Sequence, residues 1–547
     1  MTNFEVVYKF TDHVPMIAYF KTKVEAFIFS EHMKLMGYEA SDVTEGVVQQ
    51  DVLLMADSYK YSHWKQYPEN TTWIFDYMES RGGVYGVTQF VGLQYYLMKY
   101  LSAKVTVERV EYAKSRIEAH MGPGVFDYNG WMRIAVEHNG KLPVKIRAVK
   151  EGSVVPVKNV LMTMESTDKA LPWLPSFLET VLMKVWAPTT VATTSLTAKA
   201  IISQYLEETA DNLSGLPFKL HDFGDRGVSS PESAGICGLA HLVNFMGSDT
   251  TSALEVAKNF YGSLMAAFSI PATEHSSMTI LGRDGEFIQM RRFIEQFADN
   301  KIKACVSDSF DIYKAIEFWA TLKPLLIEQG ATLVVRPDSG DPIDMSLYCV
   351  DKLAHAVGYS DNSKGYRLLD PTVRVIYGDG IDDPSVIRDI LENLKRNGYS
   401  TDNMAFGMGG GLLQKNNRDT QKFAIKCSAA EISNAVVDVY KDPITDHGKV
   451  SKKGILDLVT DEEGKFHTVN LDHYYAIDFY TNNLTVFENE KSALVTVFEN
   501  GEVLVKYTLD EMREVADRTA KLYKKEILAY FEKDTFVEDV VMKVLNH

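Results

Sequence analysis

The sequence has little cysteine and no long uncharged stretch. Its four cysteines in 547 residues form no CxxC pair, so neither a zinc site of the common kind nor a disulfide framework is predicted. Reduced, buried thiols are the expectation. No uncharged run reaches the roughly 18 residues that a membrane-spanning helix needs, and the first residues lack the apolar core of a signal peptide. We therefore expect a cytoplasmic protein.

Positive charge is also in short supply. The formal net charge is −17, which repels nucleic acid and anionic membranes. No GK[ST] follows a glycine-rich segment, so there is no P-loop, and Leu412 stands where a dinucleotide-binding fingerprint needs its third glycine. With 46% hydrophobic residues the chain is typical of a folded protein. An anionic small substrate stays compatible with this charge, because a site needs only a few well-aimed cations.

The length exceeds one ordinary hydrophobic core, which indicates several domains. Residues 1–50 read as a small α+β extension, and residues 51–175 as the first part of an α+β domain. Residues 176–420 form a (β/α) barrel-like catalytic domain, and residues 421–547 return to complete the α+β domain. The predicted fold class is α/β: an irregular (β/α) barrel beside an α+β domain built from N- and C-terminal segments.

The barrel prediction comes from short apolar strands that alternate with helices between residues 217 and 412. One of these strands is expected in SIPATEH. A barrel carries its active site at the C-terminal ends of its strands. Unusual polar residues and glycines stand at those ends: Asp222, His275, Asp308, Arg336, Asp338, Asp379 and Gly409 to Gly411.

The loop HDFGDRG leads into a helix whose start is marked by Ser230 as a cap and Pro231 at its first position. Two further loops, GDG (378–380) and GMGGG (407–411), follow strands. Their backbone amides suit phosphate oxygens, although tight barrel turns are the alternative explanation.

The other candidate site residues are an arginine, several acids and one histidine. Arg336 suits a phosphate or an amide oxygen, and Asp338 with Asp308 suits Mg²⁺ held through water; a structural ion pair is the alternative. His275 beside Glu274 is either structural or a base or nucleophile. Asp249 is either a ligand contact or the N-cap of a helix beginning at residue 250. Together these residues indicate a site for a phosphorylated, Mg²⁺-bound substrate beside an uncharged or aromatic one.

Several specific sequence segments identify a family, which the chemistry of single residues does not. From about residue 51 to about residue 520 the chain resembles the nicotinamide phosphoribosyltransferases, which are type II phosphoribosyltransferases. The strings that carry the resemblance are ADSYKYSHWKQYP, KLHDFGDRGVSS, HLVNFMGSDT, ATEHSS, VSDSFDIY, VRPDSGDP, VIYGDGID, AFGMGGGLLQK and KDP…SKKG.

The resemblance implies a reaction in which nicotinamide and 5-phosphoribosyl-1-pyrophosphate give nicotinamide mononucleotide and pyrophosphate with Mg²⁺. It also implies a homodimer with shared active sites. His275 would be phosphorylated by ATP, with Glu274 or another acid orienting it.

The resemblance also assigns the base-binding residues. Phe223 would stack on the nicotinamide ring, and Tyr59 of the other subunit would cover its opposite face. Arg336 would donate to the carboxamide oxygen, and Asp249 would accept from the carboxamide N–H₂. Arg226 would reach the ribose phosphate or the ring.

The sugar and phosphate contacts follow in the same way. Asp379 with Gly378 would hold the ribose hydroxyls, and Gly409 with Gly410 the 5-phosphate. Cations of the partner subunit would bind phosphate or pyrophosphate: Arg81, Arg418, Lys426 and Lys441.

Three other functions compete with this one. A nicotinate phosphoribosyltransferase is disfavoured by Asp249, which would face the carboxylate of nicotinate. A barrel hydrolase or lyase would use Asp308 and Asp338, and a non-catalytic nicotinamide sensor would keep only the binding pocket.

Asp225 stands where the family pattern has tyrosine and would repel a phosphate or pair with Arg226. Residues 1–50 are either a regulatory module or an extension that adds strands to the first domain.

Overall fold

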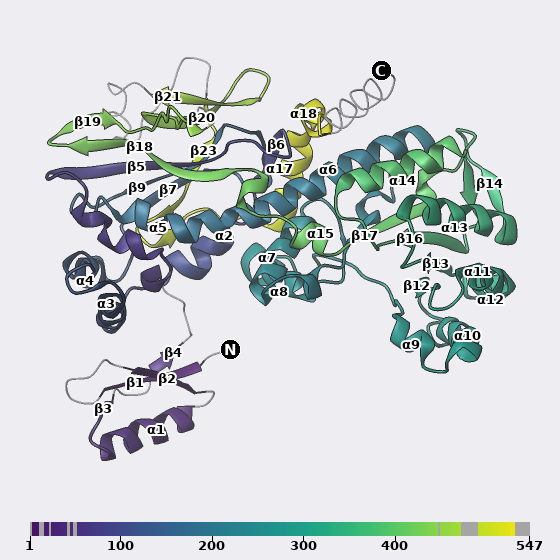
Figure 1. The fold of residues 1–547 in the computed structure, drawn as a ribbon, viewed down its shortest axis with the longest axis horizontal. Coiled ribbons are helices and arrows are strands. Elements are labelled where there is room, and N and C mark those ends of the chain that lie inside the picture. Colours follow the sequence, from purple (N-terminus) through teal and green to yellow (C-terminus); the bar gives the residue numbers. More distant parts are fainter. Residues whose placement is uncertain are drawn as a thin grey trace.

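The structure is a computed structural model and has three parts (Figure 1). They are a small N-terminal module, a domain around an antiparallel sheet, and a domain around a parallel sheet. The residues it describes are 3–9, 16–20, 23–40, 44–46, 52–446, 449–471 and 491–530.

The N-terminal module is a sheet covered by one helix, α1 (Lys23–Leu35). Its strands pair in the order β2-β1-β3, with β4 also on β1. Their bounds are β1 (Asn3–Lys9), β2 (Met16–Phe20), β3 (Glu39–Ala40) and β4 (Thr44–Gly46). Among the described strands, none of these four joins the sheet of the next domain. The idea that the extension adds strands to that domain is therefore wrong.

The second domain is built on a seven-stranded sheet in the order β19-β18-β5-β9-β7-β23-β24. Its long interior strand β5 is rich in aromatic and β-branched residues (TTWIFDYMES), which suit a pleated surface. The sheet joins both ends of the chain, because β18 pairs with β5 and β23 with β7, as predicted. The bounds are β5 (Thr71–Ser80), β7 (Val144–Val149), β9 (Val160–Ser166), β18 (Phe423–Ile432), β19 (Ala435–Asp438), β23 (Leu494–Glu499) and β24 (Glu502–Val503).

Smaller sheets and helices pack around this sheet (Figure 1). The two smaller sheets contain β6 (Val87–Gln89) with β8 (Val154–Pro156), and β20 (Ile455–Thr460) with β21 (Phe466–Leu471) and β22 (Lys491–Ser492). The helices are α2 (Leu93–Tyr96), α3 (Val107–Met121), α4 (Tyr128–Val136), α5 (Leu174–Leu182), α17 (Leu509–Leu522) and α18 (Lys524–Leu528).

The third domain contains six parallel strands in the order β11-β10-β17-β16-β13-β12. Single bridges join residue 247 to 268 and residue 272 to 304. The segment 268–272 thereby links the two edge strands and closes the irregular barrel. The strand expected in SIPATEH makes only these bridges. The bounds are β10 (Leu220–Asp222), β11 (Gly247–Ser248), β12 (Ile302–Val306), β13 (Thr332–Arg336), β16 (Val373–Tyr377) and β17 (Met404–Met408).

Helices surround this sheet, and the predicted start of one of them is confirmed. Ser230 accepts from the Ser233 N–H and Pro231 opens the next helix. The long helix α6 (Trp186–Thr209) runs between the two large domains in Figure 1. The other elements are a small hairpin of β14 (Tyr359–Asp361) and β15 (Arg367–Leu369), and the helices α7 (Pro231–Leu242), α8 (Thr251–Tyr261), α9 (His275–Thr279), α10 (Glu286–Gln296), α11 (Ile312–Thr321), α12 (Lys323–Gln329), α13 (Pro342–Val357), α14 (Pro384–Arg396) and α15 (Gly410–Leu413).

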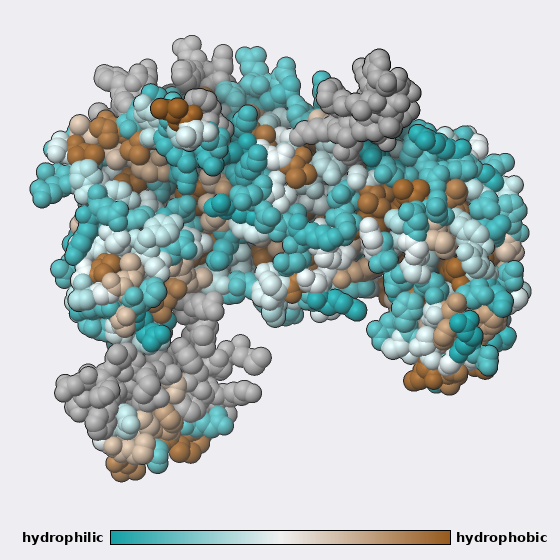
Figure 2. All heavy atoms as spheres, in the orientation of Figure 1, coloured by the Kyte–Doolittle hydropathy of each residue, from teal (hydrophilic) through white to brown (hydrophobic). Residues whose placement is uncertain are grey.

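The cysteines and the surface bear on the remaining predictions from composition. All four cysteines are free thiols and three are buried, as predicted. In the described ranges no helix is both long and apolar enough to cross a membrane. Figure 2 shows an apolar group at the tip formed by α9 and α10, where Ile280, Leu281 and Ile288 are each more than half exposed.

Candidate active site

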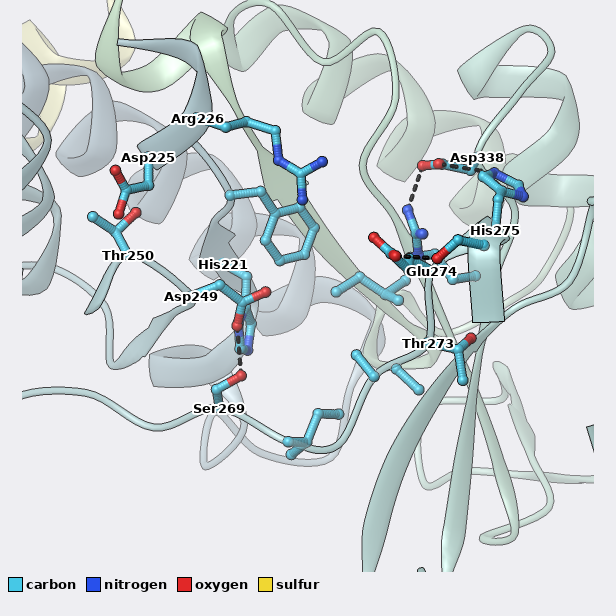
Figure 3. A pocket seen from close by; sticks show the side chains of 17 residues that line it. His221, Asp225, Arg226, Asp249, Thr250, Ser269, Thr273, Glu274, His275 and Asp338 are labelled. Atoms are coloured by element: carbon cyan, nitrogen blue, oxygen red, sulfur yellow. Dashed lines mark hydrogen bonds and ion pairs between the residues drawn. The ribbon is translucent and has the colours of Figure 1, made fainter. Parts of the chain in front are cut away.

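A cavity of about 940 Å³ opens at the C-terminal ends of the parallel strands. Its size is that of a small-molecule site. Figure 3 shows two groups of polar residues facing each other across it, one around Asp249 and one around His275. The predicted site residues that line the cavity are Phe223, Arg226, Asp249, Glu274, His275, Arg336 and Asp338.

Phe223 lies directly after β10, and two glycines make room for its ring. Its N–H donates to the Met408 carbonyl at 2.8 Å, which fixes the loop to β17. A Cβ atom at Gly407 would lie 1.9 Å from Phe223 Cε2, and one at Gly378 would lie 3.1 Å from it. Part of each glycine-rich loop therefore serves the aromatic ring, a role that the sequence analysis missed.

Asp222 ties the Phe223 loop to the end of β11. Its fully buried carboxylate accepts from the Gly224 N–H at 2.8 Å and from the Ser248 hydroxyl at 3.3 Å. Its carbonyl accepts from the Asp249 N–H at 2.9 Å. Burial raises the pKa of Asp222 to about 6. The sequence marked Asp222 only as a polar residue at the rim.

Asp249 is a wall residue of the cavity and not a helix cap. The helix α8 begins at Thr251, its N-cap is Thr250, and no side chain caps it. Asp249 Oδ1 instead accepts from the Ser269 hydroxyl at 2.5 Å. His221 also lines this wall; burial lowers its pKa, while Asp249 raises it. His221 was missed, although it stands two residues before Phe223, which is the spacing of side chains on one face of an extended chain.

His275 is the first residue of α9 and is about half exposed. Its Nδ1 lies 3.1 Å from the Ser309 hydroxyl. Its Nε2 lies 3.3 Å from Asp338 Oδ2 and 3.9 Å from Asp308 Oδ1. Glu274 accepts from the Ser276 hydroxyl instead. The acids around this imidazole are thus Asp338 and Asp308, while its neighbour in sequence faces away from it.

Asp308 and Asp338 differ in the oxygens they leave available. Asp338 contacts Arg336 through one oxygen and His275 through the other. Asp308 Oδ2 accepts from the Asp338 N–H at 2.8 Å and from the Ser339 hydroxyl at 2.5 Å. Asp308 Oδ1 is buried and has no hydrogen-bond partner in the described structure. This orphaned oxygen fits a cation or its hydration water.

Within the described ranges, no group of three or more His, Cys, Asp or Glu residues is arranged to hold a metal ion. The two carboxylates of Asp308 and Asp338 are compatible with Mg²⁺, which commonly takes one or two carboxylates and completes its shell with water and substrate phosphates.

The other predicted residues at this rim stand close by. Gly378 and Asp379 follow β16, and Gly409 is the N-cap of the short helix that Gly410 opens. An added Cβ at Gly410 would meet nothing within 4 Å, so the backbone there is open to a ligand. Asp225, which also lines the cavity, lies 3.5 Å from the Ser252 hydroxyl, and no ion pair with Arg226 is recorded among the described residues.

The remaining predicted residues lie in the antiparallel-sheet domain and are absent from the lining of the cavity described above. Tyr59 is 57% exposed, and Arg418 lies in a turn whose Thr420 carbonyl accepts from the Val84 N–H. The other three predicted cations, Arg81, Lys426 and Lys441, lie near one another in this domain.

Their proximity appears in the pKa of Lys426. Burial lowers it, and the charges of Arg81, Lys60 and Lys441 lower it further, whereas Glu179 raises it.

Solved structures share this fold. The crystal structure of nicotinate-nucleotide pyrophosphorylase from Pyrococcus furiosus matches with a TM-score of 0.54 and 15% identity, covering 86% of this chain and 95% of that one. Human nicotinic acid phosphoribosyltransferase matches with a TM-score of 0.50 and 14% identity, covering 86% and 94%. At these identities the likeness concerns the fold alone.

Sequence comparison defines the class of the protein and then its family. Residues 218–502 match the nicotinate phosphoribosyltransferase (NAPRTase) family, and residues 51–146 match the nicotinamide phosphoribosyltransferase N-terminal domain. A nicotinamide phosphoribosyltransferase of Xanthomonas campestris is 51% identical over 472 residues, which covers 85% of this chain and 98% of that protein. One from Acinetobacter baylyi is 30% identical, covering 84% and 95%. The chain belongs to the nicotinamide phosphoribosyltransferase family.

Proposed function

We propose that the protein condenses nicotinamide with 5-phosphoribosyl-1-pyrophosphate to give nicotinamide mononucleotide and pyrophosphate, a step of NAD salvage. The observation that carries the choice of base is Asp249. Its carboxylate lies in the cavity wall, held by Ser269. It suits the N–H₂ of a carboxamide and opposes the carboxylate of nicotinate. The hydrolase and lyase alternative has no support in the family that the chain belongs to.

The base lies between Phe223 and, in a dimer, Tyr59 of the other subunit. Each aromatic stack contributes roughly 1 kcal/mol beyond area burial. Arg336 donates to the carboxamide oxygen, and Arg226 reaches the ribose phosphate or the ring.

The sugar phosphate lies along the neighbouring loops. Asp379 and Gly378 hold the ribose hydroxyls, and the backbone at Gly409 and Gly410 binds the 5-phosphate. Displacement at the anomeric carbon builds positive charge on the sugar as pyrophosphate leaves. Catalysis is therefore mainly positioning and charge stabilisation.

Asp308 and Asp338 would hold hydrated Mg²⁺, and Asp308 Oδ1 offers a buried acceptor without another partner among the described residues. When bound, the ion offsets the negative charge of the diphosphate leaving group. An imidazole nitrogen of His275 accepts the γ-phosphoryl group of ATP and ADP leaves, with Asp338 and Asp308 orienting the imidazole. Phosphorylation there favours product formation and is not needed for the glycosyl transfer itself.

A homodimer completes each site. The residues assigned to the partner subunit are absent from the described lining of their own chain's cavity: Tyr59, Arg81, Arg418, Lys426 and Lys441. Arg81 and Lys441 lie near enough to Lys426 to lower its pKa, and clustered cations are what a diphosphate requires. The exposed apolar tip at α9 and α10 adjoins His275 and is of the kind that marks a protein contact.

The test is a competition assay. Purified protein receives 5-phosphoribosyl-1-pyrophosphate, Mg²⁺ and equal nicotinamide and nicotinate, with and without ATP, and the mononucleotides are quantified by mass. Nicotinamide mononucleotide that increases with ATP is expected. Nicotinate mononucleotide as the main product would refute the role of Asp249. No product from either base would favour the non-catalytic sensor.

A further inference from the structure

One buried glutamate at the end of β5 holds two cations. The Glu79 side chain is only 3% exposed. One of its oxygens contacts Lys452 Nζ, and the other lies 3.4 Å from Arg81 Nε. A buried carboxylate is costly unless it is paired, and here two cations share the pairing. The sequence analysis assigned a role to Arg81 but none to Lys452.

The two cations keep donors that Glu79 does not use. Arg81 Nη2 is buried and has no hydrogen-bond partner in the part of the chain that the structure describes. A lysine ammonium has three N–H donors. Among the described residues, the Lys452 ammonium donates one side-chain hydrogen bond, to Glu79. The side chain of Lys452 is 27% exposed, whereas that of Glu79 is 3% exposed.

The backbone around these cations is fixed as well. The Lys452 N–H donates to Tyr77 Oη at 2.9 Å, and the Tyr77 hydroxyl lies 3.5 Å from Glu79 Oε1. Tyr77 and Glu79 are two residues apart on one strand and share a face of the sheet. Lys426 stands directly opposite Tyr77 on β18. Lys452 therefore lies on the same surface as the cations that the family resemblance assigns to phosphate binding.

We propose that Lys452 is a further binding residue for the diphosphate and that Glu79 is a positioning residue that fixes the spacing of Lys452 and Arg81. Two like charges at close range repel each other. A shared carboxylate between them holds both in place before the ligand arrives, which lowers the cost of ordering them on binding. The identity of the anion, the substrate diphosphate and the pyrophosphate product, rests on the proposed function.

The experiment compares Lys452→Met and Glu79→Gln with Lys453→Met. Lys453 is the matched control, because it is the next residue, is 55% exposed and pairs with Asp438 at 3.4 Å. Calorimetry measures the Kd of pyrophosphate, and steady-state kinetics measures both KM values. We expect Lys452→Met and Glu79→Gln to raise the pyrophosphate Kd and the KM for 5-phosphoribosyl-1-pyrophosphate at least tenfold. The KM for nicotinamide should stay within twofold in both, and Lys453→Met should change none of the three values.

Two further measurements separate positioning from folding. The Glu79→Gln, Lys452→Met double variant should lose less affinity than the product of the single losses, because Glu79 acts partly through Lys452. Glu79→Asp should recover part of the lost affinity. If Glu79→Gln lowers the Tm strongly, the more exposed Lys452 alone decides the matter.

An unchanged pyrophosphate Kd in Lys452→Met would overturn the inference, and so would an equal loss in Lys453→Met. Neither result would affect the proposed function, which wild-type turnover tests separately. If the wild type bound pyrophosphate but made no mononucleotide, the proposed function would fail. The pyrophosphate Kd of Lys452→Met would still decide the role of Lys452.

Discussion

Asp249→Asn is the most direct test of how the site recognises its base. In the wild type, Oδ1 accepts from the Ser269 hydroxyl at 2.5 Å, which leaves Oδ2 to accept from the carboxamide N–H₂. Asparagine has nearly the same shape and can keep its Oδ1 on Ser269. Its Nδ2 then points a donor at the donor of nicotinamide, whereas it can donate to the carboxylate of nicotinate.

The magnitude follows from the charge of Asp249. A hydrogen bond to a charged group contributes about 1.5–3 kcal/mol, so kcat/KM for nicotinamide should fall roughly 10- to 150-fold. Two carboxylates about 4 Å apart near a protein surface repel by about 4 kcal/mol. Relief of that repulsion raises kcat/KM for nicotinate. The ratio of the two values should therefore shift by about 10³-fold or more toward nicotinate.

The assay is the same competition experiment, with kcat/KM also measured for each base alone. Asp225→Asn is the matched control, since Asp225 lines the same cavity and its nearest recorded polar contact is the Ser252 hydroxyl. It removes one negative charge without touching the proposed carboxamide contact, and the base ratio should stay the same. A ratio unchanged by Asp249→Asn, or shifted equally by both variants, would refute the reasoning.

Three other predictions follow from the geometry. His275→Ala should abolish ATP stimulation and retain ATP-independent mononucleotide synthesis; stimulation that persists would move the phosphoryl acceptor elsewhere. Gly407→Ala brings a Cβ to 1.9 Å from Phe223 Cε2, and overpacking of about 1–3 kcal/mol should raise the nicotinamide KM roughly 5- to 150-fold; an unchanged KM would exclude Phe223 from the base site. Burial raises the pKa of Asp76 from 3.8 to about 6, so the stability that protonation gives is present at low pH and lost as pH rises from about 4 through 6, up to about 3 kcal/mol. Urea unfolding at pH 4.5 and 7.5 should show this loss in the wild type and not in Asp76→Asn, and parallel profiles would contradict it.

The barrel and its rim were predictable because they depend on local patterns. Short apolar strands that alternate with helices indicate a parallel sheet, and the residues after each strand then fall on one edge. The cap at Ser230 has an equally local signal. The return of residues 421–547 to the first α+β domain was also predicted, and the structure shows it as the pairing of β18 with β5.

Contacts between loops that are distant in the sequence leave no local sequence pattern from which they could be predicted. Glu274 was the obvious partner for His275 because it is adjacent in sequence, yet backbone direction turns it toward Ser276. Asp249 stands where a helix cap is common, and only the fold brings Ser269 to it. Gly407 belongs to a loop that suits phosphate, but the ring of Phe223 occupies the space beside it. In each case local spacing allows two roles, and a tertiary contact chooses between them.

The net charge of −17 and the phosphate chemistry fit together through the way cations are held. Glu179 contacts Lys60 and lies 3.8 Å from Lys426, as Glu79 contacts Lys452 and lies 3.4 Å from Arg81. Each carboxylate thus organises two cations, and each group of three keeps a net positive charge. An acidic protein attracts a polyanion weakly at long range, so its affinity must come from short-range, preorganised donors. Replacing the glutamates should therefore weaken phosphate binding, although it makes the protein less negative.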